Sequence, residues 1–302
     1  MKIYHSIEDF PKEQGAIVTI GTFDGVHKGH KIVLDRINSI ASSRGLQSIM
    51  VTFFPHPRQV LFPEDQILKL INTMDEKIKL LEKTGLDNLI IHNFTKEFSR
   101  LESVNFIRDL LVNRLNMKYM VVGYNHQFGK NREGDYDNLL VLSELYDFDL
   151  EKIDAQIIDD IKVSSTKIRN LLLQGEISVA NNLLGYSYAI SGEVIHGDKI
   201  GRKIGFPTAN IILNQDKLVP KCGVYAVKVI VSGEEFTGML NIGCKNAKIE
   251  VNIFDFSRQI YGQIITIKLV GRLRDEMDLG DLEKLKNQLK HDKINCRKFF
   301  SI

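Results

Sequence analysis

Residues 21–30, which read Gly-Thr-Phe-Asp-Gly-Val-His-Lys-Gly-His, decide the fold of the first half of this chain. An apolar run at residues 16–20 precedes them and is typical of a short buried strand. Apolar residues at helical spacing follow over residues 31–37. A strand, a glycine-containing turn and a helix N-terminus together favour an anion site. The reason is that the first amides of a helix lack internal partners and the helix dipole favours negative charge there.

The two histidines of this stretch predict the kind of anion. His27 and His30 are three residues apart, so both side chains project from one face of the first helical turn. Gly29 lies between them and has no side chain to keep a phosphate from the backbone. Attack on the α-phosphate of a nucleotide develops charge on oxygens that imidazoles and amides stabilise. We therefore expect His27 and His30 to be catalytic residues of a nucleotide site.

The same stretch resembles the His-x-Gly-His motif of nucleotidyltransferases. In its longer form, Thr-Phe-Asp-Gly-Val-His-x-Gly-His, it is similar to the flavin adenylyltransferase half of prokaryotic bifunctional riboflavin kinase/FAD synthetases. The resemblance implies that four further residues bind ATP, namely Gly21, Phe23, Asp24 and Gly29. The plain alternative is a helix start that carries two surface histidines.

Composition sets the class of protein. A length of 302 residues predicts about two domains, and 43% hydrophobic with 26% charged residues is typical of soluble globular chains. Cys222, Cys244 and Cys296 are too few and too scattered for a disulfide framework or a zinc site, so we expect reduced thiols. The sequence shows neither a leader peptide nor a membrane-spanning run. We expect a cytoplasmic monomer or weak homo-oligomer, with small-molecule substrates and no membrane or nucleic-acid partner.

The first half alternates strand-like and helix-like segments. The expected strands are residues 17–20, 48–54, 88–92 and 119–123. The expected helices are residues 31–44, 75–84, 104–115, 137–146, 166–173 and 176–184. This alternation predicts an α/β domain with a Rossmann-like parallel sheet, helices on both faces and ligands at the carboxyl ends of the strands.

The second half is rich in β-type segments. The expected strands are residues 188–195, 223–231, 235–242, 249–256 and 263–269, and a final helix is expected at 282–291. Turns with Gly, Asn and Ser separate the strands, which predicts a small antiparallel β-barrel with a terminal helix. We place the domain boundary near Gly185, with an adenylyltransferase domain at 1–184 and a riboflavin kinase domain at 185–302.

Three more segments of the first half could contribute to the site. His56, in Phe-Pro-His-Pro after a strand, is expected near the sheet edge that carries His27, and a rigid turn with an exposed histidine is the alternative. Residues 123–134 are similar to the family segment Gly-x-Asp-Phe-x-Phe-Gly-x-x-Arg-x-Gly, which implies that Asn125 and Arg132 bind ATP. Asn125 replaces the usual Asp, which disfavours a direct metal role there.

The segment Ser-Ser-Thr-Lys-Ile-Arg opens a helix at residues 164–169. Serine and threonine are ordinary N-caps, and most such segments are only that. Arg169, however, is unfavourable in a first helical turn unless an anion is present. The segment resembles the family motif Ser-Ser-x-x-Ile-Arg, which implies contacts with the ATP phosphates from Ser164, Ser165, Thr166 and Arg169.

Residues 197–210 carry the strongest motif of the second half. Glycines spaced by four let a backbone wrap a polyphosphate, and the oxygens of Thr208 and Asn210 suit a hydrated magnesium ion. The run matches the riboflavin kinase motif Gly-Phe-Pro-Thr-Ala-Asn at all six positions, where an ordinary turn is the alternative. The resemblance implies an ATP site that contains Gly197, Lys203, Gly205, Thr208 and Asn210.

Glu250 is the candidate base of the second half. It alternates with apolar neighbours on an expected strand and faces either water or a cleft. The residue resembles the catalytic glutamate of riboflavin kinases, and Arg274 and Glu276 fit the segment of that family on the flavin side. This chain departs from the family in a shorter loop over residues 244–249 and in Asn252, where His is common.

The resemblance thus implies two ATP-dependent reactions. Riboflavin is phosphorylated to FMN in the second domain, and FMN is adenylylated to FAD in the first with release of pyrophosphate. Magnesium bridges phosphates in both sites. The shorter loop leaves a second hypothesis open, a monofunctional FMN adenylyltransferase with a non-catalytic flavin-binding domain. A flavin sensor without turnover is the third.

Overall fold

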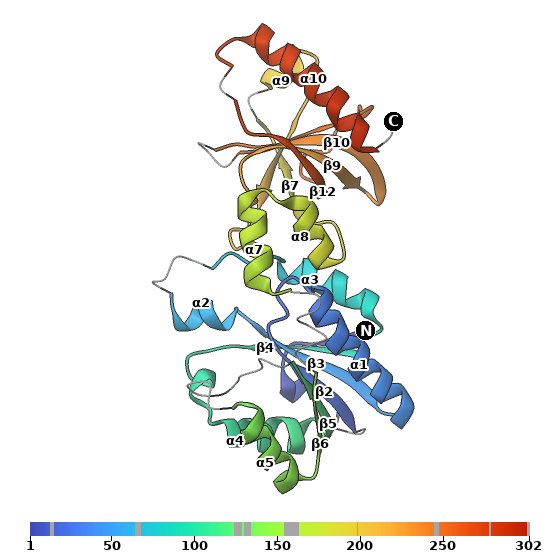
Figure 1. Ribbon diagram of the computed structural model, residues 1–302, viewed down its shortest axis with the longest axis vertical. Coiled ribbons are helices and arrows are strands. Elements are labelled where there is room, and N and C mark those ends of the chain that lie inside the picture. Colours follow the sequence, from blue (N-terminus) through green and yellow to red (C-terminus); the bar gives the residue numbers. More distant parts are fainter. Residues whose placement is uncertain are drawn as a thin grey trace. The chain divides into compact units, whose positions relative to one another are not determined.

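The computed structural model describes residues 1–12, 15–63, 68–123, 129, 134–153, 163–197, 199–244, 248–277 and 279–300. The chain divides into two compact units, Met1–Ser164 and Ser165–Ile302 (Figure 1). Each unit has its own sheet, and each is described by itself.

The first unit is built on a six-stranded sheet in the order β1-β4-β3-β2-β5-β6, with every neighbouring pair parallel. The strands are β1 (Lys2–Tyr4), β2 (Ala16–Ile20), β3 (Gln47–Phe54), β4 (Asn88–Asn93), β5 (Met117–Val122) and β6 (Asp149–Lys152). The predicted parallel α/β fold is confirmed. Edge strands β1 and β6 were not predicted, because each is short and lacks a fully apolar run.

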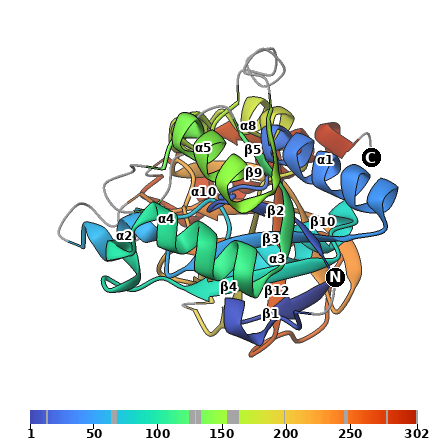
Figure 2. The same cartoon turned by 90° about the horizontal axis from the view of Figure 1, so that it is seen from below.

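Helices cover both faces of this sheet. They are α1 (Lys28–Arg44), α2 (Pro57–Leu61), α3 (Met74–Leu81), α4 (Ser103–Asn105), the π-helix Phe106–Arg114 and α5 (Tyr136–Tyr146). Figures 1 and 2 show α1 and α3 on one face and α4 and α5 on the other. Right-handed crossovers require this, because the chain moves outward from β2 to β4 and then returns past β2 to β5 and β6.

The sheet topology fixes where a ligand can bind. Strands β2 and β3 are parallel neighbours with Ile20 opposite Val51, so their carboxyl ends lie at the same edge. The turn at Gly21 therefore lies beside the turn at Pro55. Strand order reverses at β2, between β3 and β5, which is the position where open parallel sheets bind ligands.

The second unit begins with α7 (Ser165–Gln174) and α8 (Ile177–Leu184) and continues into a closed antiparallel barrel in the order β10-β11-β8-β7-β12-β9. Its strands are β7 (Ala189–Ile195), β8 (Ala209–Leu213), β9 (Gly223–Val231), β10 (Glu234–Ile242), β11 (Ile249–Ile253) and β12 (Ile264–Arg274). The predicted barrel is confirmed. Ser232 and Gly233 join β9 to β10 with φ of 49° and 86°, the left-handed pair that a tight hairpin needs.

Two helices complete the barrel unit. The short α9 (Ile200–Lys203) lies within the glycine-rich run, and α10 (Leu282–Phe300) is the predicted terminal helix, extended beyond its expected end at residue 291. The helices α7 and α8 belong to this compact unit. Gly185 ends α8 in the left-handed region with φ of 76°, and a functional boundary near it stays a prediction.

The expectation of three reduced thiols was wrong for two cysteines. Cys222 and Cys244 form a disulfide with a Cα–Cα distance of 5.2 Å, and Cys296 is free and buried. The pairing of β9 with β10 places Gly223 opposite Ile242, so the residues that flank this hairpin meet. A separation of 22 residues along the chain concealed this proximity.

Two candidate active sites

The motif of residues 21–30 forms the start of α1. His27 is the N-cap of this helix, and its Nδ1 atom accepts a hydrogen bond from the backbone N–H of His30 at 3.3 Å. The two imidazole rings stack with centroids 3.5 Å apart, as their three-residue spacing predicted. The ring of Phe23 lies against His30 with centroids 4.6 Å apart. The histidines are therefore fixed relative to each other before any ligand binds.

The turn before α1 is strained. Phe23 and Val26 have φ of 45° and 36°, in the left-handed region that residues other than glycine rarely adopt. Each such residue costs about 1–3 kcal/mol and persists where its surroundings hold it. The buried Asp24 carboxylate provides one restraint, because it accepts hydrogen bonds from the backbone N–H groups of Ile71 at 3.0 Å and Asn72 at 3.3 Å.

Lys77 of α3 provides a second restraint that the sequence analysis missed. Its Nζ atom donates to the carbonyl oxygen of Thr22 at 2.6 Å, and the residue is only 5% exposed. Burial lowers the pKa of Lys77 to about 8, although the charge of Asp24 raises it. A signal was present in the sequence: Lys77 lies four residues before buried Leu81, on the apolar face of the helix.

Burial also determines the charge of the histidines. It lowers the pKa of His27 to about 4, against the opposing effect of Asp24. Burial lowers the pKa of His30 well below its usual value, and the positive charges of His27 and Lys77 lower it further. Both rings are therefore neutral at pH 7. The Nδ1 atom of His30 is buried and has no hydrogen-bond partner among the described residues.

The glycines of the motif allow close packing. A Cβ atom on Gly29 would lie 3.1 Å from Cγ1 of Val163 and 3.3 Å from the His27 ring. One on Gly21 would lie 2.9 Å from the ring of Phe23. A side chain at either position would therefore disturb the stacked rings. This is a second reason for glycine here, besides leaving the backbone accessible to a phosphate.

The other residues predicted for this site lie on different elements of the structure. His56 caps α2, where its Nδ1 atom accepts from the backbone N–H of Arg58 at 3.1 Å, and it follows β3 at the sheet edge that carries His27. Ser164 ends the first unit. Three residues, Ser165, Thr166 and Arg169, open α7 in the second unit, and their contacts with a nucleotide stay predictions. Asn125 and Arg132 lie outside the described residues.

The barrel unit holds a cavity of about 300 Å³ between the strands and α10. Its apolar wall includes Phe206, Met239 and Leu289. Its polar lining comprises Lys199, Thr208, Asn241, Lys248, Glu250, Asn252, Arg274 and Glu276. An apolar wall with a few convergent polar groups is typical of a small-molecule site. Of the predicted kinase residues, the cavity thus brings together Thr208, Glu250, Arg274 and Glu276.

Strand register explains how Glu250 reaches this cavity. It lies directly opposite Asn241 of β10 and opposite Asn210 of β8. Side chains of directly opposed residues share a face of the sheet, with Cβ atoms about 5 Å apart. The glutamate therefore faces the cleft and not bulk water, and its nearest cross-strand neighbours are two amides.

The motif around Thr208 is held by contacts that the sequence did not reveal. The Nδ2 atom of Asn252 donates to the carbonyl oxygen of Pro207 at 2.7 Å. A Cβ atom on Gly197 would lie 2.0 Å from Nδ2 of Asn210, so the glycine-rich run packs directly on that amide. Gly205 has φ of 85°, and Lys203 is exposed at the end of α9.

Arg274 and Glu276 are fixed from opposite sides. The guanidinium of Arg274 makes two bonds to the Asp292 carboxylate of α10, at 2.9 and 2.6 Å, and Asp292 is 2% exposed. The Oε2 atom of Glu276 accepts from the backbone N–H of Cys244 at 2.7 Å. Both charged groups thus line the cavity in defined positions.

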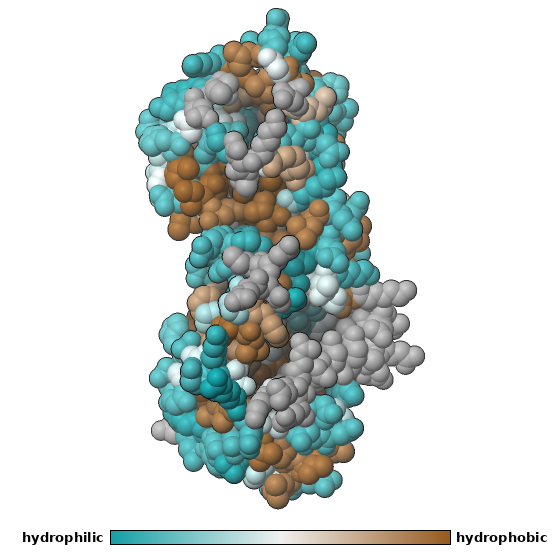
Figure 3. Space-filling view, turned by 90° about the vertical axis from the view of Figure 1, so that its left-hand side faces the viewer, coloured by the Kyte–Doolittle hydropathy of each residue, from teal (hydrophilic) through white to brown (hydrophobic). Residues whose placement is uncertain are grey.

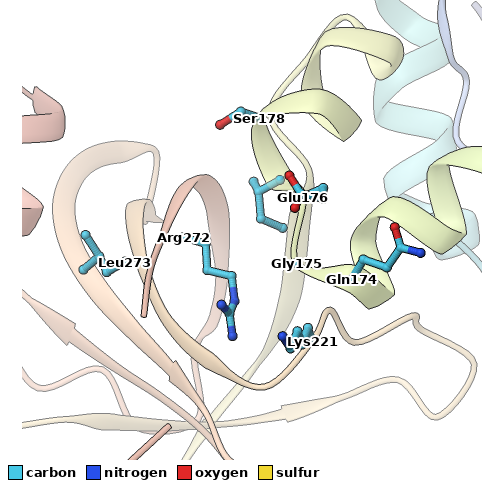
Figure 4. Close-up of a pocket in the computed structure, with 8 residues that line it drawn as sticks. Gln174, Gly175, Glu176, Ser178, Lys221, Arg272 and Leu273 are labelled. Carbon is cyan, nitrogen blue, oxygen red and sulfur yellow. The ribbon is translucent and has the colours of Figure 1, made fainter. Parts of the chain in front are cut away.

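A second cavity, of about 340 Å³, lies between the α7–α8 turn and the barrel (Figure 4). Lys221 and Arg272 line it, and none of the predicted site residues does. Both cations contact Oδ1 of Asp275, at 3.3 and 2.6 Å. This cavity lies outside both candidate active sites.

The donor set of the barrel motif suits magnesium. A hydroxyl and an amide oxygen, from Thr208 and Asn210, are the hard ligands that this ion accepts while it keeps several waters. Within the described part of the chain, no group of three or more His, Cys, Asp or Glu could hold a metal ion. A metal here would therefore depend on substrate phosphates for the rest of its ligands.

The described residues contain no helix that is long and apolar enough to cross a membrane. Figure 3 shows apolar patches among largely hydrophilic side chains on one face.

Known proteins resemble the chain along its whole length. The family model for FAD synthetase matches residues 9–167, and that for riboflavin kinase matches residues 184–300. The bifunctional riboflavin kinase/FMN adenylyltransferase of Listeria monocytogenes serovar 1/2a is 40% identical over 292 residues, which cover 94% of this chain and 92% of that protein. The protein of the same name from Escherichia coli K12 is 36% identical over 305 residues, which cover 99% and 96%.

This chain belongs to the bifunctional riboflavin kinase/FMN adenylyltransferase family. It is an ATP-using enzyme with both activities, so the hypotheses of a monofunctional adenylyltransferase and of a flavin sensor are not supported. A crystal structure named as a macrolide-efflux protein from Streptococcus pneumoniae has the same architecture. It has a TM-score of 0.86 at 29% identity and covers 98% of each chain. The FAD synthetase match covers the stacked histidines, and the riboflavin kinase match covers the barrel cavity.

Proposed function

We propose that the two activities have two separate sites. FMN is adenylylated at the carboxyl edge of the parallel sheet, around His27 and His30, and riboflavin is phosphorylated in the barrel cavity, around Glu250. The observation that carries this assignment is the cavity itself: it brings Thr208 and Glu250 together, although 42 residues of chain separate them (250 − 208).

In the adenylylation step, a phosphate oxygen of FMN attacks the α-phosphorus of ATP and pyrophosphate leaves. The attacking phosphate is already ionised at pH 7, so the site needs no general base. Two neutral imidazoles and the N-terminus of α1 stabilise the charge that develops on the α-phosphate oxygens.

In the kinase step, the terminal hydroxyl of the riboflavin side chain attacks the γ-phosphorus of ATP and ADP leaves. This hydroxyl must lose a proton, and Glu250 accepts it as general base. Thr208 and Asn210 would hold a magnesium ion through their oxygens. The ion neutralises charge on the phosphates when it is bound.

The remaining assignments follow the family resemblance. His56, Arg274 and Glu276 contact flavin. The ATP of the adenylyltransferase contacts Gly21, Phe23, Asp24, Gly29, Asn125, Arg132, Ser164, Ser165, Thr166 and Arg169. The ATP of the kinase contacts Gly197, Lys203, Gly205, Thr208 and Asn210. We place the enzyme in the cytoplasm as a monomer or weak homo-oligomer.

A time course tests the proposal. The protein is incubated with riboflavin, ATP and magnesium, and the flavins are separated by chromatography at intervals. We expect FMN first and FAD later, and we expect chelation of magnesium to stop both steps. Riboflavin that stays unchanged, while supplied FMN becomes FAD, would contradict a catalytic role for the barrel cavity.

A further inference from the structure

The disulfide lies at the rim of the kinase cavity. It joins the residue before β9 to the second residue after β10, where the connection to β11 begins. This connection is the loop that the family resemblance implies to be short in this chain. The chain therefore carries a covalent link beside the proposed kinase site.

The Cys244 end of the link contacts the cavity lining directly. The backbone N–H of Cys244 donates to Oε2 of Glu276 at 2.7 Å. The neighbouring Gly243 N–H donates to the carbonyl oxygen of Lys248 at 2.8 Å. Both Glu276 and Lys248 line the cavity, so the position of Cys244 influences two charged groups that face the substrate.

The Cys222 end is held by hydrogen bonds and by the adjoining strand β9. Its carbonyl oxygen accepts from the guanidinium of Arg272 at 2.8 Å, and Tyr225 donates to the carbonyl oxygen of the preceding Lys221. Strand β9, which starts at Gly223, pairs with β10 on one side and β12 on the other. Figure 4 shows the Arg272 and Lys221 side chains near each other. Cleavage of the disulfide would therefore release the Cys244 end and leave the Cys222 end in place.

The two cysteines of the disulfide are more exposed to solvent than the third cysteine, Cys296. Cys244 is exposed and Cys222 is half-buried, so a small thiol can approach the bond. Cys296 is fully buried, and burial raises the pKa of its thiol to about 12, which keeps it unreactive. Disulfides of reducing compartments are mostly transient or redox-sensing, and exposed ones are the labile ones.

We propose that Cys222 and Cys244 form a reversible thiol-modification site, which exchanges with low-molecular-weight dithiols and disulfides and sets the affinity of the kinase cavity for riboflavin. A thiolate of the dithiol attacks Sγ of Cys244, the S–S bond breaks, and Cys222 leaves as a thiolate that takes up a proton. The second thiol of the reagent then displaces Cys244 as a thiol and forms the disulfide of the reagent. Two electrons pass from reagent to protein, and a small disulfide reverses the exchange.

The oxidised form holds Glu276 in place through the fixed Cys244 amide, whereas the reduced form must order these groups when riboflavin binds. Ordering of one or two groups costs about fivefold in affinity. We therefore expect the KM for riboflavin to rise about fivefold on reduction, with kcat little changed. The formation of FAD from supplied FMN serves as an internal control and is expected to stay constant.

The test compares two preparations of the full chain, one treated with a dithiol and one with a small disulfide, each freed of reagent before assay. Alkylation of the unfolded chain, so that buried Cys296 also reacts, and mass spectrometry count the free thiols. The proposal predicts three in the reduced form and one in the oxidised form, with the fivefold difference in KM between them. The variant Cys244→Ser is expected to show the higher KM after both treatments, and Cys296→Ser is the matched control that keeps the full response.

Three outcomes would overturn the proposal: three free thiols after oxidation, one KM for both forms, or a response that survives in Cys244→Ser. The inference rests on the assignment of this cavity to riboflavin phosphorylation. Failure of that assignment can be told apart from failure of the redox proposal. If the assignment is wrong, Glu250→Gln keeps its kinase activity whether the disulfide is reduced or oxidised.

Discussion

The parallel-sheet unit takes the core of its site from one continuous stretch, whereas the barrel unit assembles its site from separate strands. His27 and His30 are three residues apart, and their rings stack at 3.5 Å. In the barrel, the segment before β8 supplies Thr208, β11 supplies Glu250 and the end of β12 supplies Arg274. The first arrangement depends on local helix geometry, and the second depends on strand register.

The two sites also differ in how they are held. Buried restraints on one strained turn fix the histidines, and burial keeps both rings neutral at pH 7. The polar groups of the barrel are held by the bond from Asn252 to Pro207 and by the disulfide, whose Cys244 end is exposed. We therefore expect the barrel site to be adjustable and the sheet site to be rigid.

Removal of the proposed base gives the largest expected effect. Glu250→Gln keeps the size of the side chain but cannot accept the riboflavin proton, so FMN formation should fall by about 10²–10⁴-fold. FAD formation from supplied FMN should stay unchanged, because Glu250 is not among the residues proposed for the adenylyl step. Glu193→Gln, at an exposed position on β7, is the matched control. A variant that lost both activities while still folded would show that the two sites are not separate.

The complementary variant is His30→Ala. Loss of one donor to the developing charge should lower FAD formation by about 10²–10³-fold, while FMN formation continues and FMN accumulates. His5→Ala removes an exposed histidine of the same unit and should change neither step. Chromatography of the flavins measures both variants in one assay. Unchanged FAD formation in His30→Ala would remove the imidazole from the mechanism.

Burial of the His27 ring predicts that the stability of the first unit depends on pH. Its pKa is about 4 in the folded chain and about 6.5 when unfolded, so the unfolded state binds more protons between these values. The contribution of His27 to stability is complete above about pH 6.5 and is lost as the pH falls towards 4, on the order of 3 kcal/mol.

The variant His27→Asn isolates this effect, because Asn caps helices well and does not titrate in this range. Hydrogen exchange of peptides from β2 and α1, corrected for intrinsic rates, reports the free energy of opening of the first unit. The difference between wild type and variant should change between pH 6.5 and 4. Parallel profiles would mean that His27 keeps its ordinary pKa in the folded chain.

Sequence reasoning identified the elements whose patterns are local. The strand, turn and helix around residues 21–30 and the β9–β10 hairpin were predicted with nearly correct bounds, because apolar spacing and turn residues are local signals. The short strands β1 and β6 were missed, since such edge strands form by pairing with a neighbour and carry little pattern of their own.

The missed residues have one property in common: their partners are distant in the sequence. Lys77 lies 55 residues from Thr22, Asn252 lies 45 residues from Pro207, and Cys222 pairs with Cys244 across a hairpin. No local spacing indicates such pairs, because the sheet order and strand register create them. The family motifs name the residues that we propose face the substrates, and the fold adds the residues that hold them.

The smallest expected effect tests whether these holding contacts matter to the kinase. Asn252 is 6% exposed, and its amide donates to Pro207 in the turn that leads to Thr208. A hydrogen bond of this kind contributes about 1 kcal/mol net, so Asn252→Ala should raise the KM for ATP in the kinase step about fivefold. The effect should appear in KM more than in kcat, because Asn252 positions the turn and is distinct from the proposed base.

Asn252→His supplies the sharper comparison, since His is the common residue of the family at this position and its ring N–H can also donate. We expect its KM to lie near that of the wild type. FAD formation from supplied FMN should be equal in both variants, because Asn252 and Pro207 belong to the barrel unit and neither is among the residues proposed for adenylylation. If Asn252→Ala kept the wild-type KM, the turn would be positioned by the close packing of Gly201 on Phe206 instead, where a Cβ atom would lie 2.3 Å from the carbonyl oxygen.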